Sequence, residues 1–247
     1  MECFGATDTG RVRSGNQDTF RAGELSDTAV YAVVCDGMGG PNGGAVASAV
    51  TADILQDRIV TQYREDMPTA SVFNLFESAI DAANIEVLDR AGEDASLTGM
   101  GTTVVAVLVQ NDEAIIAHIG DSRLYHLSKN GLSQVTTDHS VVQEMIEKGQ
   151  LTVAQAKNHP RKHFITRAVG VTQEVRADYD TVTLEKGDRL LLCSDGLSNM
   201  LSDAVIAEIL SGEDVPMLAQ TLIQTANLAG GEDNVTAVVI AERCDLT

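Results

Sequence analysis

The sequence predicts an α+β fold in which antiparallel sheets are covered by helices. Short apolar segments typical of strands gather early and late in the chain, and short turns join many of them. Two pairs of helical segments accompany them, whereas the strict β-α-β alternation of a doubly wound parallel sheet is missing. The 247 residues include no obvious linker, so we expect a single domain over residues 1–247.

The first third of the chain predicts a buried strand followed by two helices. Residues 29–36, AVYAVVCD, form the short apolar run that is typical of a strand buried on both faces. The apolar spacing becomes helical from 43 to 64. Over 70–91 apolar residues recur at every third and fourth position, which indicates a second, amphipathic helix.

The segment GTTVVAVLVQNDEAIIAHIGDSRLYHL predicts three consecutive strands joined by tight turns. Asn111-Asp112 is a hairpin turn signal, and Gly120-Asp121 breaks the chain a second time. The expected strands cover 102–109, 113–119 and 123–127.

Residues 138–170 predict an excursion from the sheet, because Gly149 and Pro160 interrupt short helical pieces there. Beyond it the pattern returns to strands and helices. We expect two strands, two helices and a last strand at 178–184, 189–194, about 203–210, about 215–229 and VTAVVIAER.

The composition argues against negatively charged partners. Thirty-six acidic residues against 17 Lys and Arg give a net charge of −19, and such a surface repels nucleic acid and anionic lipid. The first residues, MECFGATDTG, lack the apolar region of a signal peptide, and no apolar run approaches the ~18 residues of a spanning helix. The four cysteines are widely spaced, which favours buried thiols in a reduced, cytoplasmic setting: Cys3, Cys35, Cys193 and Cys244.

Five aspartates stand at the boundaries of predicted elements. In VVCDGMGG and LLCSDGLS an apolar run stops at an Asp followed by Gly, which lets the backbone turn sharply. The other three lie in GNQDTF, HIGDSRLY and GGEDNVTAVVI. The set is therefore Asp18, Asp36, Asp121, Asp195 and Asp233, and each side chain is placed at the rim of a sheet.

Two interpretations of these aspartates remain open at this point. Asp-Gly is a common turn dipeptide, and for any single Asp turn chemistry is the simpler account. Five of them at strand ends favour a cation site, because carboxylates brought together repel one another unless a cation lies between them. Carboxylate and carbonyl oxygens select Mg²⁺ or Mn²⁺, and no His or Cys cluster has zinc spacing.

Eight segments in order resemble the bacterial metal-dependent protein phosphatases of type 2C, a serine/threonine family. The segments are RVRSGNQD, VVCDGMGG, GTTVVAVLV, AHIGDSRLY, TTDHSVV, ITRAVG, LLCSDGLSNML and GGEDNVTAVVI. The match runs from Thr7 to Ile240, nearly the whole chain. The resemblance implies a four-layer α-β-β-α sandwich with two central antiparallel sheets, flanked by helix pairs.

The resemblance also implies roles for the aspartates. Asp36 would bridge two Mn²⁺ or Mg²⁺ ions and orient the attacking water. Gly37 would contribute to binding these ions. Asp195 and Asp233 would bind one ion, and Asp18 would help to hold the other, partly through water. Asp121 and Asp195 would support a third, weaker ion.

The implied reaction is direct hydrolysis of phosphoserine and phosphothreonine on proteins by a water that bridges the two ions. Arg13 would bind the substrate phosphate, since a guanidinium can bind two phosphate oxygens at once. The expected partners are phosphorylated proteins made by a cognate kinase. We expect a monomeric signalling enzyme in the cytoplasm.

One departure concerns the proton donor for the leaving alkoxide. Many relatives carry a His within or just after the Asp-Gly motif, where this chain has Met38 and Pro41. Its five histidines lie elsewhere in the sequence, so we assign no general acid. The excursion at about 138–170 matches the family's flap, a variable segment beside the active site. Within 157–167 it carries four basic residues and no acid, which either attracts phosphorylated substrates or forms a solvated loop.

Other functions fit the residues less well. GMGGPNGG lacks the Gly-Lys-Ser/Thr ending of a phosphate loop and the last Gly of a dinucleotide-binding motif. Asp36-Gly37-Met38 is not the Asp-x-Asp of phosphatases with an Asp nucleophile. The alternative that stays open is a catalytically weak or inactive regulatory binding module with the same fold. The metal-site aspartates and Arg13 are all present, which favours catalysis.

Overall fold

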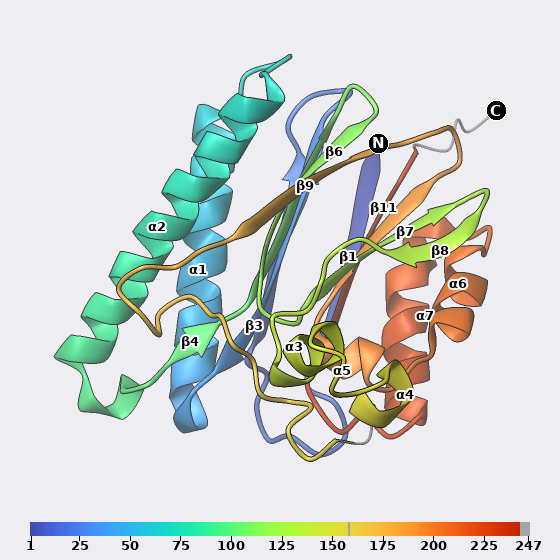
Figure 1. Cartoon of the computed structure of the whole chain (residues 1–247). Coiled ribbons are helices and arrows are strands. Elements are labelled where there is room, and N and C mark those ends of the chain that lie inside the picture. Colours follow the sequence, from blue (N-terminus) through green and yellow to red (C-terminus); the bar gives the residue numbers. More distant parts are fainter. Residues whose placement is uncertain (158, 243–247) are drawn as a thin grey trace.

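The computed structural model describes residues 1–157 and 159–242 and contains two antiparallel sheets that face each other (Figure 1). The first sheet has the spatial order β1 (Glu2–Asp8), β11 (Val235–Ala241), β10 (Arg189–Cys193), β7 (Arg123–Ser128) and β8 (Gly131–Gln134). The second has the order β2 (Asp18–Glu24), β3 (Val30–Met38), β5 (Val104–Gln110), β6 (Glu113–Ile119) and β9 (Asp178–Thr183), with β4 (Gly101–Thr102) paired to β3.

Helices cover the outer face of each sheet, so that the layers follow the order α-β-β-α (Figure 1). Helices α1 (Gly40–Gln62) and α2 (Thr69–Glu93), followed by the short η1 (Ala95–Leu97), lie on the second sheet. Helices α6 (Asp203–Leu210) and α7 (Val215–Leu228) lie on the first. The shorter α3 (Val141–Glu147), α4 (Val153–Ala156) and α5 (Asp195–Ser198) gather at one end. The predicted fold class is confirmed.

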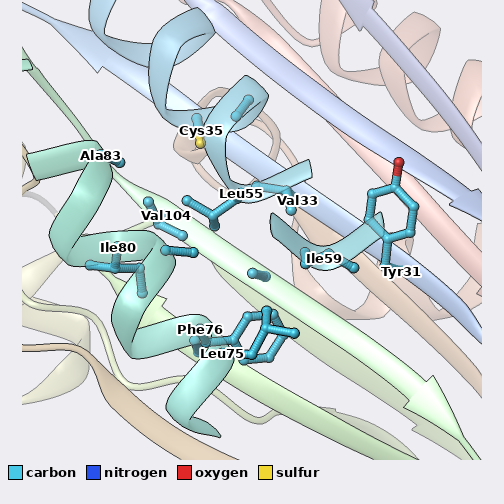
Figure 2. Packing of buried hydrophobic residues seen from close by; sticks show 14 of the residues in the cluster. Tyr31, Val33, Cys35, Leu55, Ile59, Leu75, Phe76, Ile80, Ala83 and Val104 are labelled. Carbon is cyan, nitrogen blue, oxygen red and sulfur yellow. The ribbon is translucent and has the colours of Figure 1, made fainter. Parts of the chain in front are cut away.

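Strand β5 shows why the layers form. Its side chains alternate between two cores: Val104, Ala106 and Leu108 face the helices, and Val105 and Val107 face the other sheet. Both sets are fully buried, as expected for a continuous apolar strand between two packed layers. Figure 2 shows the helix-facing core, where side chains of α1 and α2 pack on β3 and β5.

The predicted turn at Asn111-Asp112 is confirmed. Both residues have positive φ, 48° and 60°, and the register pairs Gln110 with Glu113, which is the geometry of a two-residue hairpin. The predicted strand at 102–109 is divided instead into β4 and β5. Thr103 separates them, because its backbone N–H and hydroxyl both bind Asp36.

Other element boundaries shift by a few residues. Helix α1 begins at Gly40, before the expected 43, since glycines give no apolar period to read. The last strand ends at Ala241, and residue 243 of its predicted range lies outside the described residues. Cys35 and Cys193 are buried, Cys3 is partly buried, and Cys244 is also outside the described residues. None of the helices within 1–157 and 159–242 has the length and apolar character needed to cross a membrane.

Candidate metal centre

The five predicted aspartates meet at one end of the two sheets. Asp36 lies near the end of β3, and Asp18 begins β2 directly opposite it in register. Asp121 follows β6, Asp195 follows β10 as the first residue of α5, and Asp233 precedes β11. A cleft of about 600 Å³ opens there. Its lining includes six of the seven predicted site residues: Arg13, Asp36, Gly37, Asp121, Asp195 and Asp233.

Asp36 is fixed by two threonines of the GTT segment. Its carbonyl oxygen accepts hydrogen bonds from the Thr103 N–H and the Thr102 hydroxyl, each at 2.9 Å, and its N–H donates to Thr103 Oγ1 at 2.9 Å. Burial raises the pKa of the Asp36 carboxyl well above its ordinary value of 3.8. Neighbouring carboxylates raise it further, in the order Asp18, Asp195, Asp121 and Asp233.

Asp18 is the one predicted site residue that does not line this cleft, and it is 7% exposed. Its Oδ2 accepts hydrogen bonds from the hydroxyls of Ser194 at 2.6 Å and Thr236 at 2.8 Å, which join the two sheets. In the part of the chain that the structure describes, Oδ1 is buried and has no hydrogen-bond partner. Burial raises the pKa of Asp18 to about 7, although the two hydroxyls act against the increase. A buried oxygen without a partner calls for a ligand that the protein itself does not supply.

Gly37 is required by close packing rather than by its φ. A Cβ at this position would lie 2.0 Å from the carbonyl oxygen of Gly44 and 2.6 Å from that of Gln17. Any side chain would therefore push the start of α1 away from β3. The Gly37 backbone remains at the wall of the cleft as a consequence.

The remaining carboxylates have partners at the cleft wall. Asp195 Oδ2 accepts a hydrogen bond from Asn199 Nδ2 at 3.0 Å. Asp233 Oδ2 accepts one from Arg13 Nη2 at 2.8 Å, and the Arg13 side chain is 54% exposed. Burial raises the pKa of Asp121 well above its ordinary value, and Asp195 is the charge that adds most to the increase.

This donor set fits hard divalent cations. Neighbouring carboxylates raise the pKa values of Asp18, Asp36 and Asp121, and a cation between such carboxylates stabilises them as anions. Asp18 Oδ1, which has no hydrogen-bond partner among the described residues, can bind a cation through a water molecule. Among residues 1–157 and 159–242, no three His, Cys, Asp or Glu side chains are close enough together to enclose an ion by themselves. Backbone oxygen and water would have to complete the coordination, which is usual for Mg²⁺.

The flap reaches the cleft with fewer basic residues than its sequence suggests. Of the basic residues in 157–167, Lys162 lines the cleft. Arg167 forms an ion pair with Asp178 at 2.7 Å, and Arg161 Nη2 lies 3.8 Å from the sulfur of Met145.

His163 also lines the cleft, with Nδ1 4.0 Å from Asp195 Oδ2. A histidine far from the Asp-Gly motif in the sequence therefore reaches the site, although the sequence assigned no histidine to it. Folding of the flap brings His163 to an aspartate that is 32 residues away in the sequence. No local pattern signals this approach, and the same holds for Asn199 and Thr103. Met38, one of the residues that depart from the family pattern, does line the cleft.

Comparison with known proteins agrees with this geometry. The family model described as protein phosphatase 2C matches residues 9–230. The serine/threonine phosphatase stp of Listeria monocytogenes serovar 1/2a is 39% identical over 245 residues, which cover 98% of this chain and 95% of the relative. The Streptococcus agalactiae serine/threonine phosphatase structure is 37% identical, with a TM-score of 0.90 and coverage of 98% and 99%. The catalytic domain of the phosphatase PstP, solved with two manganese ions, is 34% identical, with a TM-score of 0.84 and 96% of each chain covered.

Proposed function

The chain belongs to the protein phosphatase 2C family and is a serine/threonine protein phosphatase, and from this premise we propose which residues perform the reaction. The substrates are phosphorylated proteins. Two divalent cations, Mn²⁺ or Mg²⁺, bind at the cleft, and the structure of the PstP catalytic domain in complex with two manganese ions supports this number. The convergence of five aspartates at one rim is the observation that carries the proposal; burial and neighbouring carboxylates raise the pKa values of three of them, Asp18, Asp36 and Asp121.

Each carboxylate would have a role around the cations. Asp36 would bridge the pair, and Asp195 and Asp233 would bind one member. The Gly37 backbone and Asp18 would hold the other, Asp18 partly through water. Asp121 and Asp195 would hold a third, weaker cation. When bound, the cation pair lowers the pKa of a water molecule and stabilises negative charge on the phosphate.

The protein positions the reactants around these cations. The hydrogen bonds from Thr102 and Thr103 fix the backbone on both sides of the Asp36 side chain, so the carboxylate is placed before substrate arrives. The Arg13 guanidinium uses Nη2 for its contact with Asp233 and carries further N–H groups, which would donate to two phosphate oxygens at once. Lys162 adds a second positive charge, beside that of Arg13, at the wall of a cleft rich in carboxylates, which favours a dianionic phosphate.

The wider setting belongs to the same proposal. Residues 1–247 form one catalytic domain, and 138–170 form its flap subdomain. The enzyme acts as a monomer in the cytoplasm, away from membranes and nucleic acid, on the products of a cognate serine/threonine kinase. The coverage of 98% and 95% in the alignment with stp supports the single catalytic domain, and the charge of −19 supports the absence of anionic polymers as partners.

Removal of divalent cations tests the proposal. Excess EDTA should abolish hydrolysis of a phosphoserine or phosphothreonine peptide, and Mn²⁺ added beyond the chelator should restore it, because the attacking water is activated by the cations. Release of inorganic phosphate measures both steps. A phosphotyrosine peptide of the same sequence is the control for residue specificity. Full activity in the chelator would contradict the proposal.

A further inference from the structure

The turn that carries Asp121 is held by the first two residues of the flap. The His139 N–H donates to the Gly120 carbonyl oxygen at 2.7 Å, and the Gly120 N–H donates to His139 Nδ1 at 3.1 Å. Both polar backbone atoms of Gly120 are thus bound to a single residue, which is 6% exposed. Gly120 has φ of +104°, and a Cβ there would lie 2.5 Å from the Thr103 side chain. The residue before Asp121 therefore has little freedom to move.

The hydrogen bonds define the tautomer of His139. Because Nδ1 accepts the Gly120 N–H, the ring proton lies on Nε2, which donates to Asp178 Oδ2 at 3.0 Å. Asp178 Oδ1 accepts from Arg167 Nη1 at 2.7 Å, near the end of the flap. The Thr166 N–H also donates to the His139 carbonyl oxygen at 2.8 Å. His139 thus connects the two ends of the flap with the turn before Asp121.

The other side of Asp121 is held in a similar way. Asp138 accepts two hydrogen bonds from the Arg123 guanidinium, from Nε at 2.8 Å and from Nη2 at 2.6 Å. Between them, Ser122 Oγ lies 2.7 Å from Thr103 Oγ1, the atom that accepts the Asp36 N–H. The Asp121 turn is therefore joined to the flap and, through Thr103, to the residue proposed to bridge the cations.

We propose that His139 is a positioning residue that holds Asp121 in place through Gly120, so that the base of the flap sets how tightly a cation binds at Asp121. This inference rests on the proposed function, in which Asp121 and Asp195 bind the weaker cation. Replacing a residue that orients a metal-binding side chain, without binding the metal itself, commonly changes metal affinity 10- to 100-fold. His139 meets that description, since it binds Gly120, the residue before Asp121, and is not itself one of the residues that line the cleft.

Two substitutions separate the contacts of His139. His139→Asn places an amide oxygen near the position of Nδ1 and keeps an acceptor for the Gly120 N–H. His139→Gln places its amide near the position of Nε2, which keeps the contact with Asp178 and loses the one with Gly120. We expect H139Q to weaken Mn²⁺ binding at the Asp121 site at least about tenfold, and H139N to bind within about threefold of the wild type.

Calorimetric Mn²⁺ titration of the metal-stripped proteins measures this effect, with Asp121→Asn identifying which binding step belongs to the Asp121 site. Amide hydrogen exchange at Gly120 in the metal-free proteins is the second readout, and it should be about tenfold faster in H139Q than in H139N. His126→Gln is the matched control, because His126, on β7, is another histidine that pairs with an aspartate, Asp188, at 2.7 Å. Gln places its amide near the position of Nε2 there too and keeps the contact with Asp188, so H126Q should leave Mn²⁺ binding unchanged.

The outcomes distinguish this inference from the proposed function. Wild-type Mn²⁺ binding by H139Q, or equal weakening in H139N and H139Q, would overturn the positioning role. If the wild type bound no Mn²⁺ at all, the proposed function would fail, and Gly120 exchange would still show whether His139 holds the turn. A control variant H126Q that lost Mn²⁺ binding would show a general effect of destabilisation and would also overturn the inference.

Discussion

Replacing Asp36 by Asn should lower kcat/KM for a phosphopeptide by about a thousandfold or more, equivalent to ~4 kcal/mol of transition-state stabilisation. The neutral amide offers one oxygen in place of two anionic ones and cannot bridge a pair of cations. The backbone contacts with Thr102 and Thr103 do not involve the side chain, so the local fold should persist. Initial rates of phosphate release at saturating Mn²⁺ measure the effect.

The matched control for this substitution is Asp188→Asn. Asp188 is a buried aspartate, as Asp18 of the site is, but it lies beside His126 rather than beside other carboxylates. D188N should reduce thermal stability and leave kcat/KM within a few-fold of the wild type. Undiminished turnover by D36N, with its fold verified by circular dichroism, would contradict the bridging role of Asp36.

The metal-free enzyme should lose stability as the pH rises from about 4 to 7. The pKa of Asp18 is raised by burial to about 7 in the folded protein, against 3.8 when unfolded. Between these values the folded state holds a proton that the unfolded state has released, so the free energy of unfolding falls as the pH increases. Three pKa units correspond to on the order of 4 kcal/mol, or roughly 10 °C in the melting temperature of a chain of this size. The pKa values of Asp36 and Asp121 are also raised in the folded protein, so these two carboxylates contribute to the same loss of stability.

Divalent cations should remove this loss, because they stabilise the ionised carboxylates of the folded state. Thermal unfolding in EDTA and in excess Mn²⁺, at pH 5 and pH 8, provides the comparison. In EDTA, Asp18→Asn should remove part of the decline of thermal stability with pH. Asp53→Asn, which replaces an exposed aspartate, should leave that decline unchanged. Parallel pH profiles with and without Mn²⁺ would show that these carboxylates do not bind the cation.

The sequence alone predicts the helices and strands better than it predicts which of them lie next to one another in the fold. Apolar runs such as 29–36 identify buried strands, and Asn111-Asp112 identifies a hairpin, because these signals depend on neighbours in the chain. Periodicity does not report which strands pair. That Asp18 lies opposite Asp36, or that Asp195 approaches them from the other sheet, follows only from the tertiary structure.

The roles of the site residues are implied by the resemblance to the family. Neither the sequence pattern nor the resemblance predicts the contacts that support these residues. The eight family segments locate the aspartates and Arg13, whereas the hydrogen bonds of Thr103, Ser194 and His139 join residues up to 176 positions apart. The flap shows the same limit. Its four basic residues look equivalent in sequence, yet Lys162 reaches the cleft while Arg167 forms an ion pair with Asp178.

Anomalous diffraction from crystals soaked in Mn²⁺ tests the central claim most directly. The account predicts two strong manganese peaks in the cleft, about 3.5–4 Å apart, with Asp36 in contact with both. Asp195 and Asp233 should contact one of these ions. Absence of manganese density among these three side chains, in crystals that bind Mn²⁺ elsewhere or not at all, would contradict the assignment of the catalytic centre.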